Sequence, residues 1–290
     1  MPPSYRTSLV APAITALILF GFIPVAVKWV AANPYTIGIF RLTIAAAGLL
    51  VLTAARGELR RLPLADLGRL ATIGFFFFAH WLTLFLSIKS SSASIGAIGL
   101  STYGVHLLLL GALAGHGRVH GSDIAAVLLA VAGAVTIVPQ FRLHNQVAMG
   151  MLLSTISALF YAALPILHQR WSHLPTTLRA LGQFSFALGF FLLFLGQADF
   201  HLGARDWAGL LFLAIGVTLI GHSLWVHVTS KLSPAATSII YYGNIPIALA
   251  LSAIILGEPM SARTLTGAAL IIGGSVFGLY MQWRRSQKQI

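Results

Sequence analysis

The chain has 290 residues, of which 58% are hydrophobic and only 8% are charged. A soluble domain carries about 25% charged residues, so this chain lacks the polar surface of a soluble protein and is expected to lie in a membrane. Its 18 Lys and Arg outnumber its 6 Asp and Glu, but they cluster between apolar runs, which favours an orientation signal over a nucleic-acid partner. The absence of cysteine excludes disulfides, thiolate metal sites and cysteine nucleophiles.

Ten apolar runs are each long enough to cross a hydrocarbon core, which takes about 20 helical residues. They lie at about 10–31, 35–55, 67–88, 93–114, 121–139, 148–168, 176–196, 207–229, 234–256 and 264–283. Proline, glycine and charged residues punctuate the breaks, as at Asn33-Pro34 and Glu258-Pro259. The sequence therefore predicts an all-α polytopic membrane protein with ten transmembrane helices. We expect no cleavable signal peptide, because the first run is followed at once by a second.

The second half of the chain repeats landmarks of the first half at a nearly constant offset. Matching pairs are Pro24 and Pro165, His80 and His222, Lys89 and Lys231, Tyr103 and Tyr242, and Gly133 and Gly273. We therefore predict two five-helix repeats, at residues 1–144 and 145–290. Because five is odd, the second repeat enters the membrane from the opposite face, so the two repeats are inverted around a central cavity.

The distribution of Lys and Arg predicts the orientation. With ten spans both termini face the same side, which receives twelve Lys and Arg, while the other side receives five. The positive-inside rule then places both termini in the cytoplasm.

Several motifs carry a resemblance to a known family. They are the run from Leu19 to Pro24 followed by Lys28, then Pro34, Arg41, the run from Leu86 to Ala93, and Leu256-Gly257-Glu258-Pro259 followed by Gly267 to Gly274. On these residues the chain resembles the ten-helix EamA-type branch of the drug/metabolite transporter superfamily. In its overall sequence it looks most like the bacterial exporters of aromatic amino acids and related metabolites. The halves have diverged, since Arg118 stands where the second repeat has Glu258, and Gly182 stands where the first has Arg41.

The resemblance implies a secondary transporter in the bacterial cytoplasmic (inner) membrane. It would export aromatic and other neutral amino acids, or related small metabolites, by alternating access. Its partners would be a small-molecule substrate and membrane lipid, without nucleic acid, and we expect a monomer that is not an enzyme and needs no cofactor and no metal.

Polar and aromatic side chains deep in the apolar runs are the candidates for substrate binding. They are His80, Tyr103, Tyr161, His222, Trp225, Tyr242 and Asn244. A polar group at that depth normally faces protein or a water-filled cavity, and the alternative for each is ordinary helix packing. Tyr241 and Tyr242 are adjacent and point about 100° apart, so at most one of them faces the cavity. A cavity histidine could also carry a proton, since an unperturbed imidazole titrates near pH 6.5.

Prolines within the runs are candidate hinges, because proline removes a backbone donor from a helix. Pro24, Pro165 and Pro246 are the candidates for hinge or gating positions, with a simple kink as the alternative. Lys28 and Gln169 follow the first two by four residues and are candidates for coupling to them. Arg41 is expected to extend to the outer interface, with binding of a substrate carboxylate as the alternative.

Other functions remain open on the sequence alone. All six acidic residues fall at span ends or in connections, which disfavours a lipophilic cation as the substrate. A different metabolite class, such as a sugar phosphate, nucleoside or drug, is the alternative cargo. An intramembrane enzyme is the alternative class, but the carboxylate-poor spans disfavour aspartyl or di-metal chemistry, and a channel or photoreceptor comes third. No nucleotide-binding loop is present, so ATP is not expected to drive transport.

Overall fold

The structure, a computed structural model, describes residues 9–59, 62–113, 120–137, 145–229, 231 and 240–287. The helices of the first half are α2 (Val10–Trp29), α3 (Pro34–Ala55), α4 (Leu64–Ser90), α5 (Ala93–Leu100), α6 (Tyr103–Leu113) and α7 (Gly121–Ile137). Those of the second half are α8 (Gln146–Arg170), α9 (Thr176–Leu192), the 3₁₀ turn η1 (Leu195–Gln197), α10 (Ala204–Leu211), the π-helix η2 (Phe212–His222), α11 (Ser223–Thr229), α13 (Asn244–Leu256) and α14 (Ala262–Gln287).

The protein is an all-α polytopic membrane protein, as its composition predicts. In the described part of the chain, six helical segments are long and apolar enough to cross a membrane, and α7 and α13 are shorter apolar helices. Each predicted run coincides with helical structure, although part of the ninth lies outside the described residues. Two runs are irregular in ways that the sequence did not predict. The fourth breaks between α5 and α6, and the eighth contains the π-helix η2.

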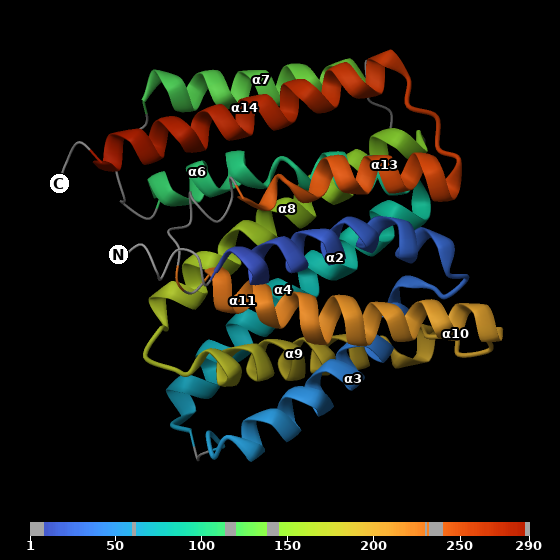
Figure 1. Cartoon of the computed structure of the whole chain (residues 1–290), viewed down its shortest axis with the longest axis vertical. Coiled ribbons are helices and arrows are strands. Elements are labelled where there is room, and N and C mark those ends of the chain that lie inside the picture. Colours follow the sequence, from blue (N-terminus) through green and yellow to red (C-terminus); the bar gives the residue numbers. More distant parts are fainter. Residues whose placement is uncertain are drawn as a thin grey trace.

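The helices form a bundle in which α2, α4, α8 and α13 lie at the centre (Figure 1). Helices α7 and α14 lie side by side along one edge, while α3 and α9 pack together at the opposite edge. Helix α2 packs on α13, and α8, which has the place of α2 in the second predicted repeat, packs on α5. Likewise, α4 packs on α9, and η2, which has the place of α4, packs on α3. These two pairs of contacts join elements that occupy equivalent positions in the two predicted repeats.

Local sequence explains where the helices begin and end. Asn33 caps α3 by accepting from Thr36 N at 2.9 Å, and Pro34 occupies the first helical position. Helix α5 is capped at its N-terminus by a residue from the other half of the chain. The Glu258 carboxylate accepts from Ala93 N and Ser94 N at 2.8 and 2.9 Å. The Glu of the Leu-Gly-Glu-Pro motif therefore joins the two halves.

Helix α13 begins later than the ninth predicted run, and this changes the role of Pro246. The prediction started that run at 234, whereas α13 starts at Asn244, so Pro246 lies in its first turn and is exposed. A first-turn residue has no helical partner for its N–H, so proline there interrupts no hydrogen bond. Pro246 therefore does not kink α13 from within, and its role as a hinge stays a prediction. Pro24 and Pro165 do lie inside α2 and α8.

Glycines allow the peripheral helices α7 and α14 to touch through their backbones. A Cβ on Gly133 would lie 2.5 Å from Gly267 O, and a Cβ on Gly267 would lie 2.7 Å from Gly133 O. Such close contact requires small residues at the interface between the two helices.

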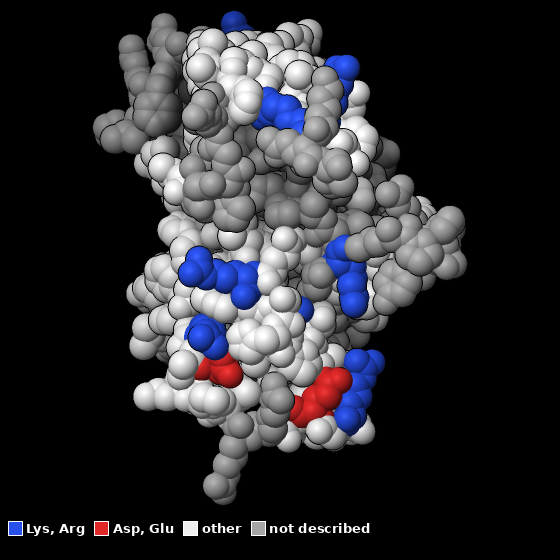
Figure 2. Space-filling view, turned by 90° about the vertical axis from the view of Figure 1, so that its left-hand side faces the viewer, with Lys and Arg blue, Asp and Glu red and all other residues white. Residues whose placement is uncertain are grey.

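Basic side chains gather where α14 ends. Figure 2 views this end of the bundle and shows Lys and Arg spread across it. Arg69 and Arg285 pair there with Asp66 and Asp123 at 2.5 and 2.6 Å. We call this the basic end of the bundle, and the other the opposite end.

Candidate functional site

A small cavity lies between the two halves of the chain. Its wall includes Phe20, Pro24, His80 and Trp81 from the first half, and Tyr161, His222, Tyr241 and Asn244 from the second half. All of these side chains are buried, and the space between them is narrow. The structure therefore shows the site closed around its centre, in the position where a ligand would contact both halves. We call this space the first cavity.

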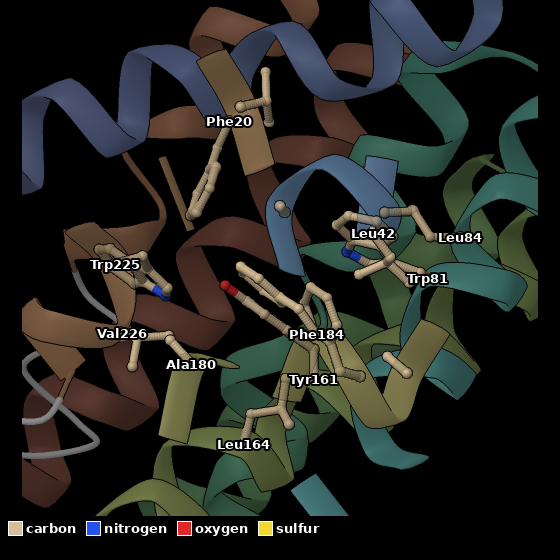
Figure 3. Close-up of a cluster of buried hydrophobic side chains, with 14 of the residues drawn as sticks. Phe20, Leu42, Trp81, Leu84, Tyr161, Leu164, Ala180, Phe184, Trp225 and Val226 are labelled. Atoms are coloured by element: carbon tan, nitrogen blue, oxygen red, sulfur yellow. The ribbon is translucent and has the colours of Figure 1, made fainter. Parts of the chain in front are cut away.

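Aromatic rings surround the first cavity. The Tyr161 and Tyr241 ring centroids are 5.2 Å apart, and Tyr103 lies behind both, at 5.1 and 5.3 Å. Phe20 lies 5.8 Å from Trp225 and 6.2 Å from Tyr241. Figure 3 shows Phe20, Tyr161, Trp225 and Phe184 converging from different helices. Rings at these separations pack edge to face or offset, and together they make an apolar wall for a flat or apolar group.

His80 is held in a defined orientation by Ser157 of α8. Its Nδ1 lies 2.7 Å from Ser157 Oγ and 3.2 Å from Ser157 O, while Ser157 Oγ donates to His80 O at 2.9 Å. Since the hydroxyl proton goes to His80 O, Nδ1–H is the donor toward Ser157, and this network assigns the tautomer. The imidazole also stacks on Tyr161 at 4.4 Å. In the neutral ring, Nε2 is then the acceptor that a ligand in the cavity could reach.

Two further polar side chains on the wall have unused hydrogen-bonding atoms. His222 Nε2 and Asn244 Nδ2 are buried and have no hydrogen-bond partner among the described residues. His222 is otherwise enclosed by rings, with Phe20 at 4.6 Å, Phe77 at 5.2 Å and Trp81 at 5.5 Å. A buried polar atom without a partner costs free energy unless a ligand or water satisfies it, so both atoms point to a ligand in the cavity.

A second small cavity lies around the C-terminal part of α8, which extends toward the basic end of the bundle (Figure 1). Its wall includes Phe77, Leu164, Pro165, His168, Gln183 and Trp225. His168 and Gln183 are bonded to each other there at 2.7 Å. Tyr161 and His222 line this space as well as the first cavity. These two side chains are therefore the partition between the two spaces.

The two helix-interior prolines lie one in each cavity wall, and the residues four positions later link helix ends. Beyond Pro24, Lys28 Nζ donates to Ser91 O at 2.7 Å and to Lys89 O at 3.3 Å. Beyond Pro165, Gln169 Nε2 donates to Thr229 O at 3.2 Å. The first link joins α2 to the end of α4, and the second joins α8 to the end of α11. The two links have equivalent places in the two halves, at opposite ends of the bundle.

The structure separates the predicted site residues into three groups. His80, Tyr161, His222 and Asn244 line the first cavity, and Trp225 lines the second. Tyr103 is fully buried behind the wall. Tyr242 does not line either cavity, because its hydroxyl accepts from Gly104 N and donates to Ser101 O, both at 2.8 Å.

Tyr242 thus holds the break between α5 and α6, and its neighbour Tyr241 faces the cavity in its place. The prediction that one of the adjacent tyrosines faces inward holds, but the choice of Tyr242 is wrong. Phe20 and Ser157 were not among the candidates. Phe20 belongs to the apolar run before Pro24 and has no distinguishing signal, whereas Ser157 is recognisable only from its contact with His80.

Comparison with known proteins gives a consistent result. The model of the EamA-like transporter family matches the chain twice, at residues 8–138 and 148–280. The chain is 25% identical over 234 residues to a probable amino-acid metabolite efflux pump of Escherichia coli (strain K12), covering 73% of this chain and 76% of that protein. A solved crystal structure aligns with a TM-score of 0.67 at 19% identity, covering 95% of this chain and 98% of that one, and it shows the likeness of fold.

Proposed function

Since the chain belongs to the EamA-like transporter family, we propose that it exports neutral amino acids, aromatic ones among them, or related small metabolites by alternating access. That it is a multi-pass membrane transporter of small metabolites follows from its family and its apolar helices. The amino-acid cargo and the transport cycle are the proposal. The observation that carries it is the closed cavity between the two halves, whose wall combines stacked rings with unpartnered polar atoms.

The composition of the wall fits an amphipathic zwitterion with an apolar side chain. Phe20, Tyr161 and Tyr241 provide ring faces for that side chain. His80 Nε2 provides an acceptor, and Asn244 Nδ2 and His222 Nε2 have unused hydrogen-bonding capacity for the polar end of the cargo. A binding site of this kind, mostly apolar with a few placed polar groups, is typical of small-molecule recognition. The name of the Escherichia coli relative supports the same class of cargo.

The two cavities support a transport path through the centre of the bundle. Tyr161 and His222 lie between them, so displacing these side chains would join the spaces. The links made by Lys28 and Gln169 lie at the two ends of this path. In alternating access, one link opens while the other stays closed. We place the basic end in the cytoplasm of a bacterial cell, with both termini there, on the positive-inside rule.

The direct test is transport by the purified protein in proteoliposomes. Uptake of labelled Phe, Trp, Thr and Met is measured with and without a pH gradient. We expect saturable flux of at least the aromatic pair, and absence of flux for all four would refute the cargo class. Flux that does not respond to the gradient would refute proton coupling through His80.

Replacing His80 with alanine tests the site within the same assay. We expect His80→Ala to lower the flux several-fold, because it removes both the ring stacked on Tyr161 and the bond to Ser157. His201→Ala is the matched control, since that imidazole is fully exposed and pairs only with the nearby Asp199. Equal flux in the His80 and His201 variants would mean that His80 is a packing residue.

A further inference from the structure

Arg41 of α3 is entirely buried, contrary to the expectation that it extends to the outer interface. Its Nε donates to Thr218 Oγ1 at 2.9 Å. Its guanidinium carbon lies 4.0 Å from the centroid of the Trp81 ring and 5.4 Å from that of Phe85. Helix α4 and the π-helix η2 therefore cover the side chain that the sequence placed at the surface.

The guanidinium has no counter-charge within the described protein. Both terminal nitrogens, Nη1 and Nη2, are buried and have no hydrogen-bond partner among the described residues. All six acidic residues are described, and none of their ion pairs involves Arg41. Arginine stays charged in proteins, and a buried charge is costly unless it is paired. An intramembrane charge of this kind indicates a functional site.

Arg41 lies just behind the wall of the first cavity. Trp81 is both its stacking partner and a wall residue. Thr218 lies one turn before His222, another wall residue, on the same π-helix. A ring that covers the face of a guanidinium leaves its in-plane N–H donors free at the edge. Those donors match the two oxygens of a carboxylate in a bidentate arrangement.

We infer that Arg41 is the anion-binding end of the transport site and takes the carboxylate of the cargo on Nη1 and Nη2. This inference rests on the proposed function and specifies which part of the cargo is recognised. Thr218 fixes the guanidinium through Nε, and Trp81 stacks on its face. The cargo's apolar side chain then lies among Phe20, Tyr161 and Tyr241.

The test compares two probes that differ in the carboxylate alone, L-phenylalanine and L-phenylalaninamide. Binding to purified protein in detergent is followed by the ligand-induced shift in melting temperature, and flux is followed in proteoliposomes. We expect the wild type to prefer L-phenylalanine at least tenfold. Arg41→Met should abolish that preference. Arg41→Lys should retain part of it, because lysine keeps the charge but lacks the paired N–H donors of the guanidinium.

Stability distinguishes this role from a structural one. Removing a buried charge that has no counter-charge should leave the melting temperature of Arg41→Met unchanged or higher. Arg179 is the matched control, because it is also buried but is bonded to Leu174 O, His168 O and Thr176 Oγ1. Arg179→Met should lower the melting temperature and leave the preference for the carboxylate intact.

Three results would overturn the inference. They are an equal response of the wild type to both probes, a full preference retained in Arg41→Met, and an equal loss of preference in Arg179→Met. If Arg41→Met does not fold, Thr218→Val decides the question. This substitution keeps the charge of Arg41 but removes the hydroxyl that accepts from Arg41 Nε, so the preference for L-phenylalanine over the amide should fall several-fold. An unchanged preference would overturn the inference. Absence of wild-type response to either probe would instead refute the amino-acid cargo itself.

Discussion

Lys28 links α2 to the end of α4 at the end opposite the basic end, and in the proposed transport cycle its loss should open that end. Lys28→Met keeps an unbranched side chain but removes the donors that bond Ser91 O at 2.7 Å and Lys89 O at 3.3 Å. A hydrogen bond from a charged donor contributes about 1.5–3 kcal/mol. Because the side chain is half-buried, we count only the shorter bond at about 1.5 kcal/mol. Since 1.4 kcal/mol is a factor of ten, the open fraction at this end should rise about tenfold.

The natural absence of cysteine makes this measurable with a single introduced thiol. Ala97 lines the first cavity and is buried, so Ala97→Cys reports access from that side. The rate of labelling by a membrane-impermeant maleimide is proportional to the open fraction when that fraction is small. The labelling rate of the Ala97→Cys protein is compared with that of the Ala97→Cys/Lys28→Met protein, in vesicles of both orientations.

The mirror-image link provides the internal control. Gln169→Met removes a neutral hydrogen bond to Thr229 O, which contributes about 1 kcal/mol, so labelling of Leu164→Cys in the second cavity should rise about fivefold. Lys28→Met should raise labelling in the first cavity alone, and Gln169→Met should raise labelling in the second cavity alone. An unchanged or slower labelling of Ala97→Cys in Lys28→Met, at an unchanged melting temperature, would refute the assignment of Lys28 as a closing link.

Three more predictions follow from single hydrogen bonds. Tyr242→Phe should cost about 1–3 kcal/mol of stability, seen as a lower melting temperature, because Gly104 N is left buried without an acceptor. A wild-type melting temperature would contradict the role of this hydroxyl at the helix break. Glu258→Gln should cost about 1 kcal/mol, because the amide cannot accept from both capped N–H groups of α5. No loss of stability would mean that water replaces the cap. Ser157→Ala should lower the transport rate about fivefold at little cost in stability, because the Nδ1–H of His80 loses its nearer acceptor. An unchanged rate would show that the tautomer of His80 does not matter for transport.

The helical spans were predictable because long apolar runs have one stable form in a membrane, where backbone groups must bond within the helix. Depth in a span also guided the choice of candidate residues. His80, Tyr161, His222 and Asn244 were selected because they are polar or amphipathic where lipid would penalise them, and all four line the cavity.

The remaining errors arise from helix irregularities that periodicity does not reveal. The break between α5 and α6 exposes Ser101 O and Gly104 N, and it is these groups that bind the hydroxyl of Tyr242. Arg41 stays inside because the π-helix η2 presents Thr218 to it, while the hydroxyl of Thr218 also bonds Leu213 O five residues back, at 2.8 Å. Neither a helix break nor a π-helix has a residue pattern that distinguishes it from a regular apolar helix.

The partition between the two cavities is only one layer of side chains thick, and this limits what it can control. Cargo passing in either direction meets the same two groups, the Tyr161 ring and the His222 imidazole. A substitution at Tyr161 therefore changes the forward and reverse rates by the same factor and leaves their ratio untouched. Net export must then come from the concentration difference of the cargo, or of an ion that moves with it, and not from any directional preference of the barrier.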